Sequence, residues 1–211
     1  MKKITILLLT SILLIGCTIV RIDTKSIDNI VSVILSKQNK LYNQVGKGYK
    51  YYIPRNVTYI DTNELNDRLY SNGNYYYLYI DVIGYYHQKV LDYQVNEGAY
   101  YSRKLDFNGK QGYLEINKYK NKYFIEFMYN YAKIEAVVNK EDINDVVLNA
   151  SYILSTIKFN SNVIKLMLDK DFFSNKESKY DIFTAKKQIE SFLQYFDEEE
   201  NQEQEIDEEV D

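Results

Sequence analysis

Few side chains in this sequence belong to the types that carry out chemistry. The single histidine, His87, could act as a general base or bind a metal, but neither a cysteine nor a fixed carboxylate accompanies it. Asp81, Glu126 and Glu135 fall on predicted strands, where two carboxylates in register could serve acid–base chemistry or bind calcium. The alternatives are a surface histidine at a strand end and ordinary solvent-facing acids, and spacing alone leaves both open.

Two familiar catalytic motifs are absent from the chain. Lys47 between two glycines, Gly46-Lys47-Gly48, suggests a phosphate-binding loop, but the spacing Gly-x4-Gly-Lys-Ser/Thr is missing. The pattern Gly-x-Ser-x-Gly is also missing, so a Ser–His–Asp arrangement would have to use His87 without a supporting motif. We therefore assign no catalytic residue and do not expect an enzyme.

Three alternating tyrosines form the most promising group for binding. The run from Tyr75 to Ile83 predicts a strand with Tyr75, Tyr77 and Tyr79 on one face. Tyrosines on an exposed sheet face can stack against sugar rings or peptides, because each offers apolar area with a polar tip. The alternative is that a helix packs on this face and buries them. Tyr75, Tyr77 and Tyr79, with His87, are the predicted ligand-binding residues.

The only cysteine, Cys17, ends a segment that has the features of a secretion signal. Lys2 and Lys3 precede an apolar run, residues 4–15, that is shorter than the roughly 20 residues of a membrane-spanning helix. The box Leu14-Ile15-Gly16-Cys17 resembles the lipobox of bacterial lipoproteins. The resemblance implies cleavage before Cys17, a diacylglycerol thioether on its sulfur and acylation of the new amino terminus, including palmitate. The alternative is an uncleaved signal anchor with an incidental cysteine.

Lipidation of Cys17 would place the protein on the extracytoplasmic face of the cell membrane. Two or three acyl chains suffice for stable anchoring. The mature chain would then contain no thiol, no disulfide and no cysteine cluster for a metal, so we expect no cofactor.

Charge is divided unevenly along the chain. The chain has 23 tyrosines, no tryptophan and one proline, a bias expected of an AT-rich genome, the alternative being selection for a tyrosine-rich surface. Residues 197–211 contain ten acidic and no basic residues, which predicts a disordered tail. The body between signal and tail holds 20 acidic and 24 basic residues, an excess of four positive charges. We expect a signal peptide over 1–16, a tether over 17–25, a single domain over 26–196 and the acidic tail over 197–211.

Hydrophobic periodicity predicts helices at both ends of the domain and strands between them. Apolar residues spaced by three and four predict helices over 26–39, with Thr24 or Ser26 as cap, over 141–157, and over 181–196, while 163–168 is strand or short helix. Asn72-Gly73 and Asn108-Gly109 predict turns, the second a hairpin, and another turn begins at Asn121. The expected strands span 49–53, 57–60, 75–83, 100–107, 112–119, and 123–138 as one bent strand or two in sequence. This order predicts an α+β fold with an antiparallel sheet.

Two segments resemble proteins of the PsbP-like family. Gly48-Tyr49-Lys50-Tyr51-Tyr52-Ile53-Pro54 is similar to their aromatic opening strand. Their closing strand resembles Ile134 to Val138, and the helix that follows it resembles residues 141–154. Their final element resembles Ser155-Thr156-Ile157-Lys158-Phe159. The resemblance covers 48–159 and implies a central antiparallel sheet flanked by helices, accessory or binding roles, and no catalytic residues. The third helix and acidic tail depart from the family pattern.

Together these features predict a membrane-anchored binding or accessory module of the cell envelope. Its partners would be membrane lipid through Cys17 and an envelope protein or glycan, and no nucleic acid. The alternative is a carboxylate-dependent hydrolase of the cell envelope that uses Asp81, Glu126, Glu135 or His87. A third possibility, a structural partner in a secreted complex, predicts an exposed apolar patch of several hundred Å².

Overall fold

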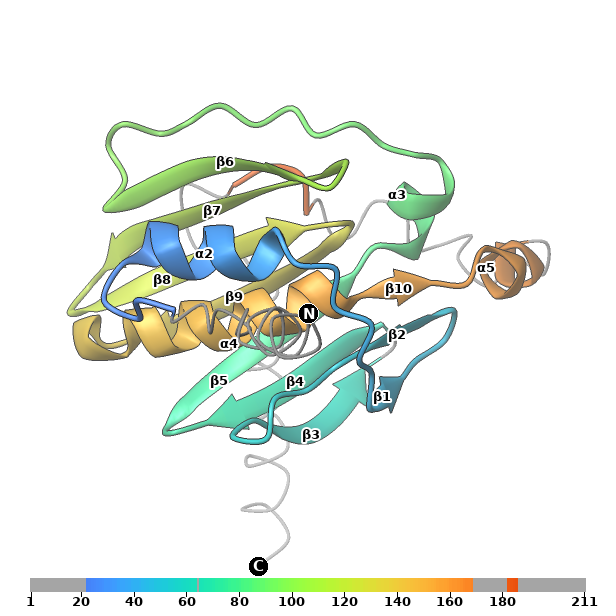
Figure 1. The fold of residues 1–211 in the computed structure, drawn as a ribbon, viewed down its shortest axis with the longest axis horizontal. Coiled ribbons are helices and arrows are strands. Elements are labelled where there is room, and N and C mark those ends of the chain that lie inside the picture. The colour runs from blue at the N-terminus through green and yellow to red at the C-terminus, as the bar shows by residue number, and fades with distance from the viewer. Residues whose placement is uncertain (1–21, 64, 169–181, 186–211) are drawn as a thin grey trace, which may run out of the picture.

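A seven-stranded antiparallel sheet forms the centre of the protein in the computed structural model, which describes residues 22–63, 65–168 and 182–185 (Figure 1). The strand order is β3-β4-β5-β9-β8-β7-β6. Strands β3 and β4 lie on one side of the central β5–β9 pairing, and β8, β7 and β6 lie on the other. The β5–β9 pairing joins parts of the chain about 55 residues apart. The strands are β3 (Thr58–Asn63), β4 (Asn66–Ser71), β5 (Asn74–Ile80), β6 (Tyr101–Phe107), β7 (Lys110–Tyr119), β8 (Lys122–Tyr129) and β9 (Ala132–Val138).

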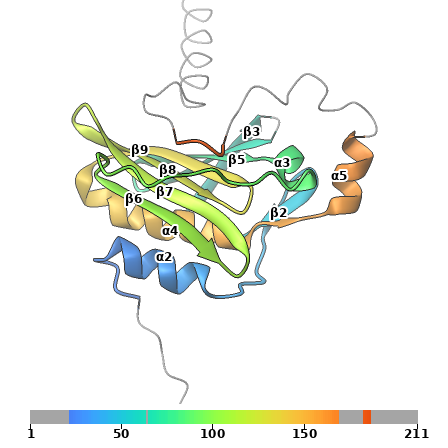
Figure 2. The same ribbon diagram turned by 90° about the horizontal axis from the view of Figure 1, so that it is seen from above.

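Two helices cover one face of this sheet (Figure 2). Helix α2 (Ile27–Leu35) begins at Ser26, whose hydroxyl accepts a hydrogen bond from the Asn29 amide and satisfies a donor that the first turn leaves open. Helix α4 (Ile143–Thr156) follows a single 3₁₀ turn, η1 (Lys140–Asp142). Both helices turn their apolar stripe toward the sheet. We call the opposite side of the sheet the outer face.

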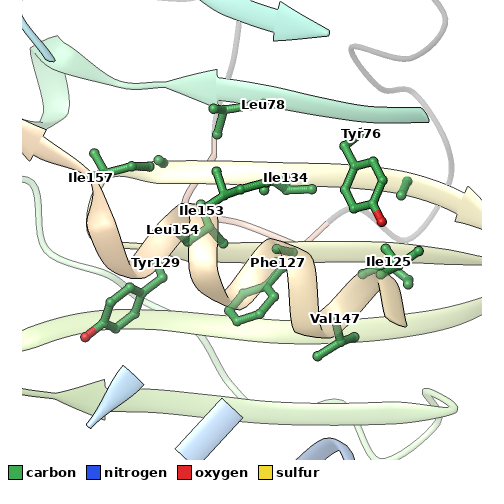
Figure 3. Close-up of a cluster of buried hydrophobic side chains, with 14 of the residues drawn as sticks. Tyr76, Leu78, Ile125, Phe127, Tyr129, Ile134, Val147, Ile153, Leu154 and Ile157 are labelled. Atoms are coloured by element: carbon green, nitrogen blue, oxygen red, sulfur yellow. The ribbon is translucent and has the colours of Figure 1, made fainter. Parts of the chain in front are cut away.

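The main core lies between the sheet and these two helices (Figure 3). Leu78 of β5 and Ile125 and Phe127 of β8 meet Val147 and Leu154 of α4, and all are fully buried. Burying one such side chain stabilises the fold by about 1.5–3 kcal/mol. The apolar alternation of the strands therefore decides which face of the sheet the helices occupy.

Tight turns with left-handed backbone close the hairpins. Asn108 and Gly109 have φ values of 52° and 71°, and Asn72 and Gly73 have values of 49° and 81°. These are the positive angles that two-residue hairpin turns require, and Asn and Gly adopt them at low cost. Asn130 and Tyr131, at 53° and 61°, divide the β-rich segment 123–138 into β8 and β9.

A second, three-stranded sheet lies at one end of the molecule. Its order is β1-β2-β10, formed by β1 (Gln44–Val45), β2 (Tyr49–Tyr51) and β10 (Lys158–Phe159). Helix α5 (Ser161–Leu168) follows β10, and the Asn160 amide donates to the Gly48 carbonyl at 2.8 Å. This bond joins the β1–β2 hairpin to the start of α5 (Figure 1).

The predicted α+β class with its antiparallel sheet is confirmed, and several element boundaries were wrong. Helix 26–39 ends at Leu35, and 163–168 is helical. The strand predicted over 75–83 ends at Ile80, because the Asp81 carboxylate accepts from the Gly84 amide and caps helix α3 (Val82–Tyr86). Strand β4 was not predicted. Residues 182–185 are not helical, and the rest of the helix predicted over 181–196, like the tail 197–211, lies outside the described residues.

Cys17 and the predicted signal 1–16 also lie outside the described residues. Within the described part of the chain, no helix has both the length and the apolar character needed to span a membrane.

Candidate functional site

One transverse row of side chains crosses all seven strands on the outer face. Glu126 on β8 lies between Glu115 on β7 and Glu135 on β9, and it is paired in register with both. Glu135 is in turn paired with Tyr77 on β5. All of these alternate with core residues and therefore point away from α2 and α4. We call this the polar row; in strand order it contains Asp61, Arg68, Tyr77, Glu135, Glu126, Glu115 and Ser102.

A buried lysine lies beside the carboxylates at the centre of the row. Lys133 Nζ is 2.6 Å from Glu135 Oε1 and 3.6 Å from Glu126 Oε1, and all three side chains are at most 4% exposed. Among the described residues, the Glu135 oxygens have no hydrogen-bond partner, so Lys133 holds Glu135 by charge rather than by hydrogen-bond geometry. Because buried charges need compensation, the lysine makes burial of this glutamate pair possible.

Glu115 belongs to a separate hydrogen-bond network. The Tyr93 hydroxyl donates to Glu115 Oε2 at 2.5 Å, and the side-chain amides of Asn96 and Asn117 each donate to Oε1 at 2.9 Å. Burial, followed by this contact with Glu115, raises the pKa of Tyr93. The network binds the segment between α3 and β6 to the outer face.

An apolar cluster covers this part of the outer face. Tyr93 stacks on Tyr113 with ring centroids 4.4 Å apart, and the Tyr113 hydroxyl donates to the Ile182 carbonyl. Burial raises the pKa of Tyr113, and the charges of Glu126 and Glu135 raise it further. Leu91, Met128 and Phe183 complete the cluster. The β6–β8 half of the row is therefore closed.

The β3–β5 half is open and aromatic. Tyr75 is 45% exposed, and its ring centroid lies 5.1 Å from that of Tyr70 and 6.4 Å from that of Tyr77. The Arg68 guanidinium lies 6.0 Å from the Tyr75 ring centroid and forms an ion pair with Asp61 at 2.6 Å. We call Tyr70, Tyr75, Tyr77, Arg68 and Asp61 the tyrosine surface.

The predicted site residues are only partly brought together. Tyr75, Tyr77 and Tyr79 share the outer face as predicted, but Tyr77 is 7% exposed and Tyr79 half-buried, so Tyr75 is the accessible member. His87 follows the last turn of α3, exposed and edge-on to Tyr86. It lies on a different element from the tyrosine surface.

The predicted carboxylates divide in the same way. Glu126 and Glu135 face each other across β8 and β9, whereas Asp81 caps α3. None of the three cavities described here is lined by Glu126 or Glu135. Within the described residues, no group of three or more histidine, cysteine or acidic side chains is arranged to hold a metal ion.

Sequence reasoning missed Arg68, Tyr70, Glu115 and Lys133. A signal for the first two was present, because a hairpin folded at Asn72-Gly73 pairs Tyr70 with Tyr75 and Arg68 with Tyr77.

Comparison of the chain with protein-family models, with curated proteins and with solved structures finds no match.

Proposed function

We propose that the protein is a lipid-anchored binding or accessory module on the extracytoplasmic face of a bacterial cell membrane. Its lipid is attached at Cys17, and its partner is an envelope glycan or protein that contacts the tyrosine surface. The observation that supports this proposal best is the exposure of Tyr75 beside Tyr70 and Arg68.

The tyrosine surface has the chemistry of a recognition surface. Aromatic rings offer apolar area for sugar rings or peptide side chains, and their hydroxyls offer hydrogen bonds. The Arg68–Asp61 pair adds a donor and an acceptor at one edge, and because both are anchored on strands, little side-chain freedom is lost on binding. A rigid platform of this kind suits a repeated or extended partner.

The start of the described chain favours an orientation with the outer face directed away from the membrane. Ile22, five residues after Cys17, packs against the core on the helix side. The Asp23 amide donates to Asn29 of α2, and the Asn144 side chain of α4 donates to the Thr24 carbonyl. At about 3.5 Å per residue, the tether spans less than about 20 Å. The lipid would then lie on the α2–α4 side.

The PsbP-like relationship also remains a proposal. The order β9, α4, β10 agrees with the closing strand, helix and final element on which the resemblance rests. The antiparallel central sheet agrees with its fold.

Retention of the protein on envelope material tests the tyrosine surface. The double variant Tyr70→Ala/Tyr75→Ala should lose capture by insoluble cell-wall glycan or by membrane-protein crosslinking, because it removes the exposed Tyr75 ring and the half-buried Tyr70 ring beside it. Tyr86→Ala/Tyr100→Ala is the matched control, since these tyrosines are also exposed but lie elsewhere. Equal capture of both double variants would refute the proposed surface.

Membrane fractionation tests the anchor separately. Cys17→Ala should release the protein from membranes and abolish incorporation of labelled palmitate, because the thiol that receives the lipid is gone. Continued membrane retention of an unlipidated, signal-cleaved product would contradict the anchor.

The pairing of Glu126 with Glu135 favours one second candidate, a carboxylate-dependent hydrolase of the cell envelope. Its carboxylates are 0% and 1% exposed, so a substrate would have to open the outer face. If the candidate is correct, Glu126→Gln and Glu135→Gln each abolish glycan turnover while the exposed Glu97→Gln does not. Unchanged turnover in both variants would exclude it.

A further inference from the structure

The largest described cavity is a groove at the end of the molecule opposite the start of α2. It has a volume of about 710 Å³ and lies between the β1–β2 hairpin, β10 and α5. Val45, Val163 and Met167 give it an apolar wall, and Val45 is 67% exposed. None of these elements belongs to the tyrosine surface (Figure 1).

The groove is positively charged. Lys47, Lys50 and Lys158 line it, and no carboxylate is among its described lining residues. Burial and the charge of Lys158 lower the pKa of Lys110, which lines a different cavity, as expected where like charges gather. Apolar walls with a lysine rim favour an occupant that has both apolar and acidic groups.

Two successive ring contacts connect the last described residues to the wall of this groove. Phe183 contacts Tyr131 with ring centroids 5.9 Å apart, and Tyr131 contacts Phe159 of the groove wall at 6.3 Å. Lys89 lies over the Phe183 ring. Asp197 follows Ala185 by twelve steps along the chain, and at about 3.5 Å per step this stretch reaches roughly 40 Å, enough to enter the groove.

We propose that the acidic tail of this chain, residues 197–211, binds in the lysine-lined groove between β1, β10 and α5. The tail contains ten acidic residues and also Ile206 and Val210, so it matches both the charge and the apolar wall of the groove. Because the tail is covalently attached, its effective concentration is high and the contact does not depend on protein concentration. The tail thereby excludes other anionic chains from the groove.

Zero-length crosslinking of the full chain tests the contact directly. A carbodiimide joins a lysine amine to a carboxylate only where the two touch. We expect crosslinks from residues 197–211 to Lys47, Lys50 or Lys158 within monomers, and their loss near 1 M salt, where charge screening acts over about 3 Å. Crosslinks spread equally over Lys104, Lys118 and Lys122, or found only between molecules, would overturn the proposal.

A peptide competition separates the tail from other occupants. The probe is a labelled synthetic peptide of residues 197–211, and the test protein is the full chain with its ten tail acids changed to Asn or Gln. The peptide should bind this protein at least about tenfold more tightly than it binds the unaltered chain, whose own tail occupies the groove.

Lysine substitutions in the protein whose ten tail acids are changed to Asn or Gln locate the peptide site. The triple variant Lys47→Gln/Lys50→Gln/Lys158→Gln should lower the affinity for the peptide by about tenfold. The matched control changes the exposed Lys104, Lys118 and Lys122 to Gln and should leave binding unchanged. Two results would show that the groove is open and overturn the proposal. One is equal affinity of the peptide for the protein with the altered tail and for the unaltered chain. The other is tight binding of inorganic polyphosphate to the unaltered chain. If the lysine variant fails to fold, crosslinking of the unaltered chain still decides.

Discussion

Lys133 and Glu135 point to the same side of strand β9 and meet at 2.6 Å in the interior of the protein. Two residues along a strand bring side chains to one face, so this ion pair follows directly from the strand geometry. Its second neighbour, Glu126, comes from β8. Lys133 therefore compensates a carboxylate on its own strand and one on β8, at a place where an uncompensated charge would be costly.

Removal of the lysine should be strongly destabilising. Lys133→Met leaves two buried carboxylates without their cation and should lower the free energy of unfolding by about 3–5 kcal/mol, measured by urea denaturation. Adding Glu135→Gln to that variant should recover part of the loss. Lys122→Met, on the exposed start of β8, is the control. A loss below about 1 kcal/mol for Lys133→Met would contradict the inferred role of the lysine.

Asp67 should make stability depend on acid pH. It is 3% exposed, and burial raises its pKa above the ordinary 3.8 although the Tyr51 hydroxyl donates to it at 2.6 Å. The folded state therefore retains a proton that the unfolded chain has lost. Compared with Asp67→Asn, the unaltered protein should lose stability as the pH rises from about 3.8 through the folded pKa, and then level off.

Denaturation of both proteins between pH 3 and 8 measures this difference. Exposed Asp106→Asn is the control. If the unaltered protein instead becomes more stable relative to Asp67→Asn as the pH rises, the pKa of Asp67 is lowered in the folded state and the prediction is wrong.

Buried tyrosines should make the fold sensitive to alkali. Burial is the largest cause of the raised pKa of Tyr51, Tyr113 and Tyr129. Burial, followed by the contact with Asp28, raises the pKa of Tyr101 to about 12. The folded state keeps these phenols protonated, whereas the unfolded chain loses the protons near pH 10. Their contribution is therefore complete below pH 10 and is lost as the pH rises further.

Absorbance at 295 nm and circular dichroism, followed together, measure this transition. We expect the phenolate signal of the buried tyrosines to rise in one cooperative step with loss of secondary structure. Complete ionisation of all 23 tyrosines with the fold intact would rule out this explanation.

The absence of tryptophan allows a direct test of membrane orientation. Single tryptophans at Tyr152 on α4 and at Tyr75 on the tyrosine surface report the two sides of the sheet. In lipidated protein on vesicles that contain brominated lipid, Tyr152→Trp should be quenched more strongly than Tyr75→Trp. Stronger quenching at Tyr75 would reverse the proposed orientation, and the same variants without lipid at Cys17 are the control.

Local patterns in the sequence were sufficient for the elements whose signal lies within a few residues. Ser26 as a cap, Asn108-Gly109 as a hairpin turn and the apolar stripe of α4 each depend on neighbours along the chain, and each is confirmed. The alternation that directs Tyr75, Tyr77 and Tyr79 to one side was equally local and is confirmed. The lipid attachment at Cys17 stays a prediction of the same local kind.

Tertiary structure alone decided which of these side chains meet. Glu126 faces Glu135 because a turn at Asn130 and Tyr131 sets the register, and Tyr77 joins them because β5 pairs with β9 across a long stretch of chain. Exposure was also decided at this level, since Tyr93 and Phe183 pack over one half of the outer face and leave Tyr75 open. Local propensity specifies the direction of a side chain along its own strand, whereas its neighbours and its access to solvent depend on contacts between distant segments.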